Sequence, residues 1–311
     1  MTQPQHTGGR VNVLTKPEVI GTIEELRSRL IDAQSRIESE RAGRGDDAGG
    51  TPRIVLVPTM GALHAGHLTL VRRARSLGEI VVVSIFVNPL QFGAGEDLGT
   101  YPRTLDADVA ALAAEGVPFV FAPTSQVMYP DGDASTRVTA GTVGSLFEGA
   151  ARPGHFDGML TVVAKLFNIV GPDVAVFGQK DAQQVFLVER MLADLDFRTR
   201  IEVVPIVRED GGLALSSRNR ALEPDQRAAA RALSAGLADA ASVAGQGAEV
   251  ALQVAHARID AEPLVKLDYL VVVDPRTFLP VRALHHGPAR MLVAALVGHT
   301  RLIDNVALEL P

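Results

Sequence analysis

Apolar residues first form a regular pattern at the start of the chain. They recur at three- and four-residue steps from Ile23 to Ile37, which predicts an amphipathic helix. Thr22 precedes this stripe and Glu25 follows three residues later, the spacing of a capping box. Two heptads are few for a coiled-coil seam, so we expect the stripe to pack against a sheet. Residues 1–10 are polar and aperiodic, and we expect a disordered tail.

After a loop-like stretch at residues 43–52, buried apolar runs alternate with helix-like segments. The runs are too continuously apolar for strands with one face in water, so they fit strands covered on both faces. Such strands need crossover connections, which predicts an α/β fold with a Rossmann-like, doubly wound parallel sheet. We expect strands at Arg53–Thr59, Ile80–Val87, Phe119–Ala122, Val174–Phe177 and Ile201–Ile206, and helices at Ala65–Leu77, Leu105–Glu115 and Gly158–Val170, with Asp181 as the N-cap of the next helix.

The pattern changes near Val207. A Gly-Gly turn and a long Ala-rich helix from about Pro224 lead to strand-like runs at Leu267–Val273, Arg290–Val297 and Leu302–Leu308. This order is typical of an α+β unit. We therefore expect a Rossmann-like domain at residues 1–206 and a smaller α+β domain at residues 207–311.

Composition narrows the classes of function. The 311 residues carry 30 Lys and Arg against 36 Asp and Glu, a net charge of −6 that argues against a nucleic-acid partner. Cysteine is absent, which excludes disulfide frameworks, thiolate zinc sites and cysteine nucleophiles. The sequence shows neither a continuous apolar span nor a secretory signal, so we expect no membrane partner and a cytoplasmic location.

The strongest chemical signal is the string PTMGALHAGH at residues 58–67, between an expected strand and an expected helix. The free N–H groups of a helix start favour an anion there. His64 and His67 are three residues apart and so project from one helical face, while Gly66 lets a nucleotide approach the backbone. The histidines could instead be metal ligands or surface residues, but the strand–turn–helix context favours phosphate contact.

His-Ala-Gly-His in this setting resembles the His-x-Gly-His signature of the nucleotidyltransferase superfamily, which includes class I aminoacyl-tRNA synthetases. Further strings narrow the resemblance to the pantothenate synthetase family, over nearly the whole chain after residue 12. They are FVNPLQF at residues 86–92, YPRT at 101–104, RPGHF at 152–156, FGQKDAQQ at 177–184 and LSSRN at 215–219. Strings that end parallel strands converge on one crevice with the histidines.

The resemblance implies a ligase that uses ATP to activate pantoate as an adenylate, which the amine of β-alanine then attacks. Adenylyl transfer develops negative charge on phosphate oxygens, so the site needs fixed cations and donors. The catalytic residues so implied are His64, His67, Lys180, Ser216, Ser217 and Arg218. The implied contacts to ATP are Pro58, Thr59, Met60, Gly61, His64, Gly66, His67, Gly178, Gln179, Lys180, Asp181, Val207, Leu215, Ser216, Ser217 and Arg218.

The resemblance also implies the remaining site residues. Gln91 and Gln184 match the pantoate-binding glutamines, while Asn88, Glu148 and Arg152 stand where β-alanine or the adenylate is handled. Mg²⁺ is expected with ATP, held mainly by phosphate oxygens and water. Asp108 could assist the ion, or it could be a solvated helix carboxylate. Gln179 stands where many members have Glu, a change that we expect to be neutral. The resemblance further implies a homodimer built through the first domain.

Two other functions stay open at this stage. Another nucleotidyltransferase, acting on a phosphorylated alcohol, would share the His-x-Gly-His string but would not need the glutamine-bearing strings at residues 86–92 and 178–184. A non-catalytic nucleotide-binding module would keep Gly61 and Gly66 but would tolerate loss of His64, His67 and Lys180, all of which are present.

Overall fold

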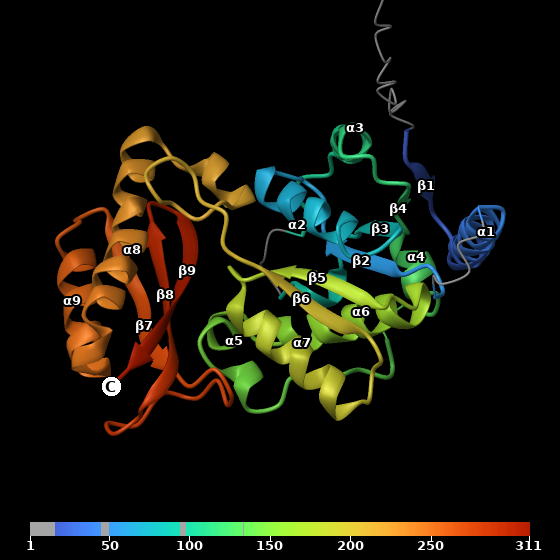
Figure 1. The fold of residues 1–311 in the computed structure, drawn as a ribbon. Helices are drawn as coiled ribbons and strands as arrows, with labels where there is room; N and C mark the ends of the chain where they lie inside the picture. Colours follow the sequence, from blue (N-terminus) through green and yellow to red (C-terminus); the bar gives the residue numbers. More distant parts are fainter. Residues whose placement is uncertain (1–15, 45–49, 94–97, 133) are drawn as a thin grey trace, which may run out of the picture.

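The computed structural model describes residues 16–44, 50–93, 98–132 and 134–311. The expected tail at residues 1–10 and part of the expected loop at 43–52 lie outside the described residues. Two sheets organise the described chain, each with its own helices, and they stand side by side in Figure 1.

The larger sheet has six parallel strands in the order β1-β4-β3-β2-β5-β6. After β2 the chain proceeds to one side of the sheet, and from β5 onward it proceeds to the other side. The carboxyl ends of β2 and β5 therefore form the switch point, where α/β sheets bind their ligands. The strands are β1 (Glu18–Ile20), β2 (Ile54–Thr59), β3 (Ile80–Ile85), β4 (Phe119–Phe121), β5 (Val174–Gly178) and β6 (Arg200–Val204).

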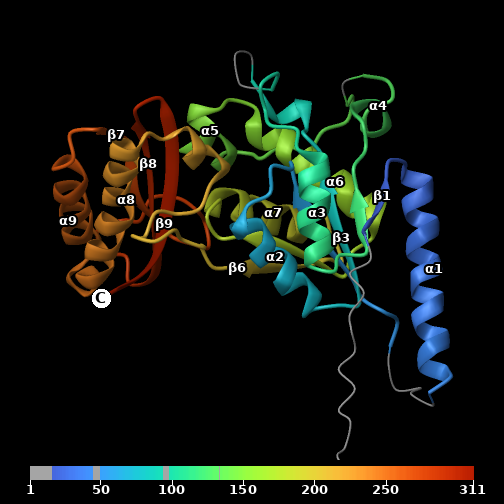
Figure 2. The ribbon, with the colours of Figure 1, turned by 90° about the horizontal axis from the view of Figure 1, so that it is seen from above.

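Helices cover both faces of this sheet (Figure 2). Alternate residues of β2 explain why: Ile54 and Leu56 join one apolar cluster, and Val55 and Val57 join another on the opposite face. The first cluster includes α1 (Ile23–Ala42), α6 (His155–Val170) and α7 (Ala182–Asp194), and the second includes α2 (Ala65–Arg75) and α3 (Leu105–Ala114). Two short helices, α4 (Ser125–Met128) and α5 (Glu148–Ala151), lie in the connections.

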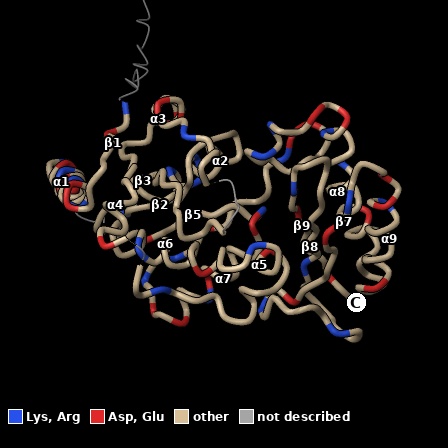
Figure 3. Tube along the Cα trace, turned by 180° about the vertical axis from the view of Figure 1, so that it is seen from behind, with Lys and Arg blue, Asp and Glu red and all other residues tan. Residues whose placement is uncertain are grey.

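The second unit is a three-stranded antiparallel sheet of order β7-β8-β9 with two helices packed against it. A separate apolar cluster, centred on residues such as Leu233 and Met291, joins these elements. They are α8 (Pro224–Ser242), α9 (Ala248–Asp260), β7 (Val265–Val273), β8 (Gly287–Val297) and β9 (Thr300–Leu310). In Figure 3, Lys and Arg are interspersed with Asp and Glu along both units. Over the described ranges, no helix has the length and apolar character needed to cross a membrane.

The α/β class with a parallel sheet is confirmed, and the expected strands and helices form with shifts of a few residues at their ends. Thr22 caps α1 by accepting a hydrogen bond from the Glu25 N–H at 3.3 Å. Leu26, Leu30 and Ala33 of the predicted stripe are buried, in the cluster that covers the sheet. The sequence patterns missed β1, which is only three residues long, and α9, whose apolar face is made mainly of alanines.

Candidate active site

The turn between β2 and α2 is built around two residues with left-handed backbone angles. Gly61 has φ +83° and Ala62 has φ +51°. A Cβ on Gly61 would lie 3.1 Å from both Asp108 and Ile85, so this position needs glycine for space as well as conformation. Thr59 braces the turn, donating to the Ser84 carbonyl and accepting from the Gly61 N–H.

Asp108 holds the same turn from the first helical turn of α3. Its carboxylate accepts hydrogen bonds from the N–H groups of Ala62 at 3.0 Å and Leu63 at 2.8 Å, and from the Thr104 hydroxyl at 3.1 Å. The side chain is 3% exposed, so the interpretation of Asp108 as a solvated carboxylate is wrong. Because both oxygens already accept hydrogen bonds, the geometry favours a structural anchor over a ligand for Mg²⁺.

His64 and His67 cap the start of α2 through their own rings. His64 Nδ1 accepts from the Gly66 N–H at 3.1 Å, and His67 Nδ1 accepts from the His64 N–H at 3.3 Å. Since each Nδ1 is an acceptor, each neutral ring carries its proton on Nε2. Both Nε2–H groups are therefore hydrogen-bond donors, as charge on a phosphate requires.

Both histidines are neutral at physiological pH. Burial and the proximity of His64 lower the pKa of His67 to about 3. Burial, followed by the positive charge of Lys180, lowers the pKa of His64. The ring centroids are 4.0 Å apart, close enough that two imidazolium ions would repel each other. The pair therefore supplies donors, and the fixed positive charge comes from elsewhere.

The neighbouring His64 ring explains the glycine at position 66 more specifically than the approach of a nucleotide to the backbone does. A Cβ at this position would lie 2.9 Å from two atoms of the His64 ring, and 3.7 Å from the Leu215 Cβ. Glycine thus makes room for the ring that caps the helix. The Leu215 contact also shows that the start of α2 lies beside the Leu215–Asn219 loop.

Lys180 lies in the turn between β5 and α7, at the other side of the switch point. The Gln179 N–H donates to the Val204 carbonyl at 2.9 Å, which ties the turn to β6. Asp181 occupies the N-cap position of α7 as expected, but its side chain makes no capping hydrogen bond. Its carboxylate instead lines the cavity described below.

The Ser216–Arg218 loop approaches from the start of the second unit. The Leu215 N–H donates to the Val207 carbonyl at 2.9 Å, and Arg208 pairs with Ala214, so the loop closes a short hairpin. The Ser216 hydroxyl accepts from the Arg218 N–H at 3.2 Å. Arg218 is exposed and borders the cavity, where its guanidinium adds positive charge.

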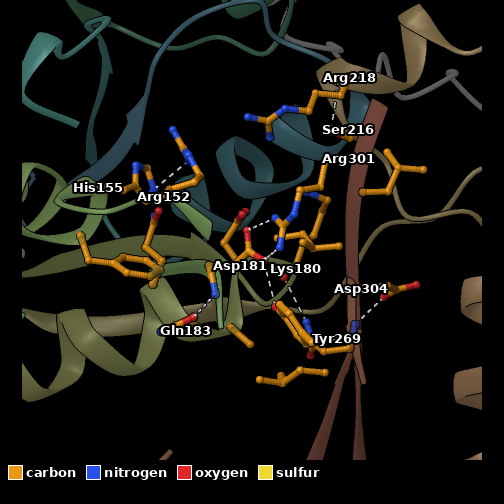
Figure 4. Close-up of a pocket in the computed structure, with 18 residues that line it drawn as sticks. Arg152, His155, Lys180, Asp181, Gln183, Ser216, Arg218, Tyr269, Arg301 and Asp304 are labelled. Carbon is orange, nitrogen blue, oxygen red and sulfur yellow. Dashed lines mark hydrogen bonds and ion pairs between the residues drawn. The ribbon is translucent and has the colours of Figure 1, made fainter. Parts of the chain in front are cut away.

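A cavity lies where the two units meet (Figure 4). Residues from α5, the Lys180 turn, the Ser216 loop and strands β7, β8 and β9 line it. Seven of them were predicted as site residues: Glu148, Arg152, Lys180, Asp181, Gln184, Ser216 and Arg218. His155, Tyr269, Arg301 and Asn305 also line it and were missed. His64 and His67 are not lining residues, but Lys180 and Asp181 are near enough to influence their pKa values.

A buried amide network holds Gln91 in place. Asn88 is 1% exposed, and its Nδ2 donates to Gln91 Oε1 and to the Gly158 carbonyl, each at 3.0 Å. Its Oδ1 accepts from the Tyr129 hydroxyl and from the Leu90 N–H. With its hydrogen-bonding groups engaged in this way, Asn88 is placed to orient Gln91 rather than to contact β-alanine.

His155 connects Gln91 to Arg152. Its Nε2 lies 3.1 Å from Arg152 Nη1, and its Nδ1 lies 2.9 Å from the Gln91 carbonyl. A guanidinium can only donate, so Nε2 accepts and Nδ1 carries the proton that it donates to the carbonyl. His155 is buried, and the string Arg152–Phe156 was its only signal in the sequence.

Glu148 joins the two units. Its carboxylate accepts from Arg301 of β9 at 2.7 Å on each oxygen, and from the Tyr269 hydroxyl of β7 at 2.9 Å. Burial lowers the pKa of Arg301, but its hydrogen bonds to Glu148 and Asp268 outweigh this and raise it overall. The expected contact between Glu148 and β-alanine would have to share a carboxylate that these residues already occupy.

The described side chains give no support for a metal site built from protein ligands alone. Over the described ranges, no group of three or more His, Asp or Glu side chains is arranged to hold a metal ion.

The fold and site together define a class of protein. A parallel sheet carries paired histidines and a lysine at its switch point, beside a Ser- and Arg-bearing loop, which is the arrangement of a nucleotide-binding α/β enzyme that handles phosphates. The model of the Pantoate-beta-alanine ligase family matches residues 18–307. The chain belongs to the pantoate-β-alanine ligase family.

Similar proteins agree with this assignment. The chain is 65% identical over 260 residues to the pantothenate synthetase of Leifsonia xyli subsp. xyli, a match that covers 83% of this chain and 90% of the relative. It is 53% identical over 308 residues to the pantothenate synthetase of Mycolicibacterium smegmatis, a match that covers 98% of this chain and 90% of the relative. The pantothenate synthetase structure from Thermus thermophilus matches with a TM-score of 0.81 and 45% identity, covering 93% and 98%.

A further solved structure carries ligands in its description. The pantoate-β-alanine ligase from Francisella tularensis, complexed with beta-gamma ATP and β-alanine, matches with a TM-score of 0.72 and 33% identity, covering 93% of this chain and 97% of that one.

Proposed function

We propose that the chain is an ATP-dependent ligase that condenses pantoate with β-alanine. The pantoate carboxylate attacks the α-phosphorus of ATP and releases pyrophosphate, and the β-alanine amine then attacks the adenylate and releases AMP. The observation that carries this proposal is the switch point, where the paired neutral histidines of α2 lie beside the Lys180 turn.

Each group has a part in the first step. Lys180 and Arg218 supply fixed positive charge to the phosphates, while His64 and His67 supply Nε2–H donors. Charge that develops on the leaving pyrophosphate is stabilised by such preorganised groups. Ser216 and Ser217 supply hydroxyls, and the other proposed ATP contacts lie within residues 58–67 and 178–181, at Val207 and within residues 215–218.

The second step needs position more than acid–base chemistry. A free amine attacking a mixed anhydride gains most from orientation and from exclusion of water.

The proposed pantoate ligands are Gln91 and Gln184. Gln91 is held by Asn88 and His155, and Gln184 lines the cavity. Neutral amides suit pantoate because they bind its carboxylate without removing the nucleophilicity that the first step requires. Arg152, beside His155, would face the adenylate.

Three further features belong to the same proposal. ATP binds with Mg²⁺ that is held mainly by phosphate oxygens and water, the ligands that this ion ordinarily keeps in nucleotide sites. Residues 207–311 act as a smaller domain that bears Ser216–Arg218 and closes over ATP; their separate apolar core supports this division. The protein works in the cytoplasm. It forms a homodimer built through the domain at residues 1–206, and light scattering would test the dimeric mass.

The function is tested with purified protein and substrates. We expect pyrophosphate release from ATP only when pantoate is present, and AMP and pantothenate, identified by mass spectrometry, once β-alanine is added. Activity with a phosphorylated alcohol in place of pantoate would instead identify another nucleotidyltransferase, and binding of ATP without turnover would identify a non-catalytic module.

Variants test the assigned residues. We expect Lys180→Ala and His64→Ala each to slow adenylate formation by about a hundredfold or more, the scale of losing one preorganised donor. Lys266→Ala is the matched control, because Lys266 is exposed on β7 and does not line the cavity. Single-turnover rates near those of the unmodified protein would refute the roles of Lys180 and His64.

A further inference from the structure

We propose that Asn305 of β9 is a positioning residue for Lys180, a role that rests on the proposed function of Lys180 at the ATP phosphates. Asn305 is 3% exposed. Its Nδ2 donates to the carbonyl oxygens of Gln179 at 2.9 Å and of Lys180 at 3.1 Å. One amide of the second sheet thus contacts the turn that carries the lysine.

The orientation of this amide is fixed on its other side. Asn305 Oδ1 accepts from Arg290 Nη1 of β8 at 2.6 Å. A guanidinium can only donate, so the oxygen must face Arg290 and the NH₂ group must face the two carbonyls. Asn305 makes these contacts as a donor, which an isosteric carboxylate cannot do.

The two carbonyls determine the backbone of Lys180. The Gln179 carbonyl belongs to the peptide plane before the Lys180 Cα, and the Lys180 carbonyl belongs to the plane after it. Because peptide groups are planar, the relation between these planes is set by φ and ψ of Lys180. An amide that holds both planes therefore sets the direction in which the Lys180 side chain leaves the turn.

The neighbouring residue of β9 holds the second cationic segment. The Asp304 carboxylate accepts from Arg208 at 2.6 and 3.0 Å. Arg208 pairs with Ala214 at the base of the hairpin that presents Ser216 and Arg218. Two successive strand residues thus fix both segments that bring positive charge to the proposed phosphate site.

Asn305→Asp is the sharpest test, because it keeps the size and the acceptor for Arg290 but turns an oxygen toward the two carbonyls. We expect single-turnover adenylate formation to fall about tenfold or more, since a small displacement of a catalytic group is costly. The KM for pantoate should stay within about twofold. Asn168→Asp, the same change at an exposed position on α6, is the control and should leave the rate unaltered.

A double-mutant cycle separates positioning from general stability. If Asn305 acts through Lys180, Asn305→Asp should change the residual rate of the Lys180→Ala protein by less than about twofold. An equal loss in both backgrounds would overturn the positioning role. If circular dichroism shows that Asn305→Asp does not fold, the neutral variant Asn305→Ala enters the same cycle. If the unmodified protein forms no adenylate, the proposed function is overturned and this inference with it. If the unmodified protein is active and both Asn305 variants form adenylate at the same rate as it does, the inference alone is overturned.

Discussion

Replacing Asp108 by Asn tests whether this carboxylate anchors the His64 turn or serves the nucleotide's metal ion. The amide keeps one acceptor oxygen and presents an NH₂ group to the other side. Whichever way it turns, the N–H of Ala62 or of Leu63 loses its acceptor in a buried site. Loss of a buried hydrogen bond to a charged group costs about 2 to 3 kcal/mol.

Hydrogen exchange followed by mass spectrometry measures this cost where it arises. A weakening of about 2 to 3 kcal/mol raises the opening equilibrium of the turn by about 30-fold to 150-fold, at 1.36 kcal/mol per tenfold. We therefore expect amide exchange at residues 61–63 to accelerate by this factor, and adenylate formation to slow because the His64 ring loses its support.

The matched control is Asp106→Asn, which removes an exposed carboxylate from the same first turn of α3. It alters the charge at the helix start equally but touches no backbone of the His64 turn. Unaltered exchange at residues 61–63 in the Asp108 variant, together with a higher Mg²⁺ requirement for turnover, would refute the anchoring role and restore that of a metal ligand.

Further measurements test other contacts. Glu148→Gln and Arg301→Met should each lower the thermal unfolding temperature, and the double variant should be no less stable than the less stable of the two single variants. Additive losses of stability would contradict a direct interaction between Glu148 and Arg301. His67 takes up a proton near pH 6.5 when unfolded but only near pH 3 when folded, so its contribution to stability is complete above pH 6.5 and declines as the pH falls toward 3. Denaturant titrations of His67→Gln should show a shallower decline over that range, and an equal slope would refute the low pKa. Gln91→Ala and Gln184→Ala should raise the pantoate KM about tenfold without changing that for ATP, and a constant pantoate KM in steady-state assays would place the substrate elsewhere.

Sequence patterns predicted most of the central sheet, because its helices have an apolar period and its longer strands are continuous apolar runs. The runs at β2 and β3 are apolar on both faces, and the sheet buries both faces. Strand β1 has three residues, too few for a period, and its pairing with β4 joins positions about a hundred residues apart. Such an edge strand is defined by its partner and not by its own composition.

The predictable part of the site is the part written in short strings. His64, His67 and Lys180 each lie in a string whose neighbours determine the local turn. Asp108 and Asp106, by contrast, are the same residue type in the same helical turn, and only the approach of the β2–α2 turn distinguishes them.

The residues from the second sheet were missed for the same reason. Arg301 is 153 positions from Glu148, and Asn305 is 126 positions from Gln179. Neither lies in a string with chemical meaning, since an Arg or an Asn on a strand is ordinarily a surface residue. Their roles exist only after β9 has packed against the Lys180 turn.

Strand β9 is the last element to be synthesised, so the contacts that it makes with the first unit are the last to form. Every residue assigned to ATP precedes position 219, so a ribosome has made the whole set while β9 is still unmade. The nascent first sheet can form, as domains fold in the order in which they emerge. Until β9 arrives, however, the carboxylate of Glu148 lacks its guanidinium partner, and the Lys180 turn lacks the amide that holds its carbonyls. A chain stalled before residue 300 would thus carry every motif of the family with Lys180 not yet fixed in place.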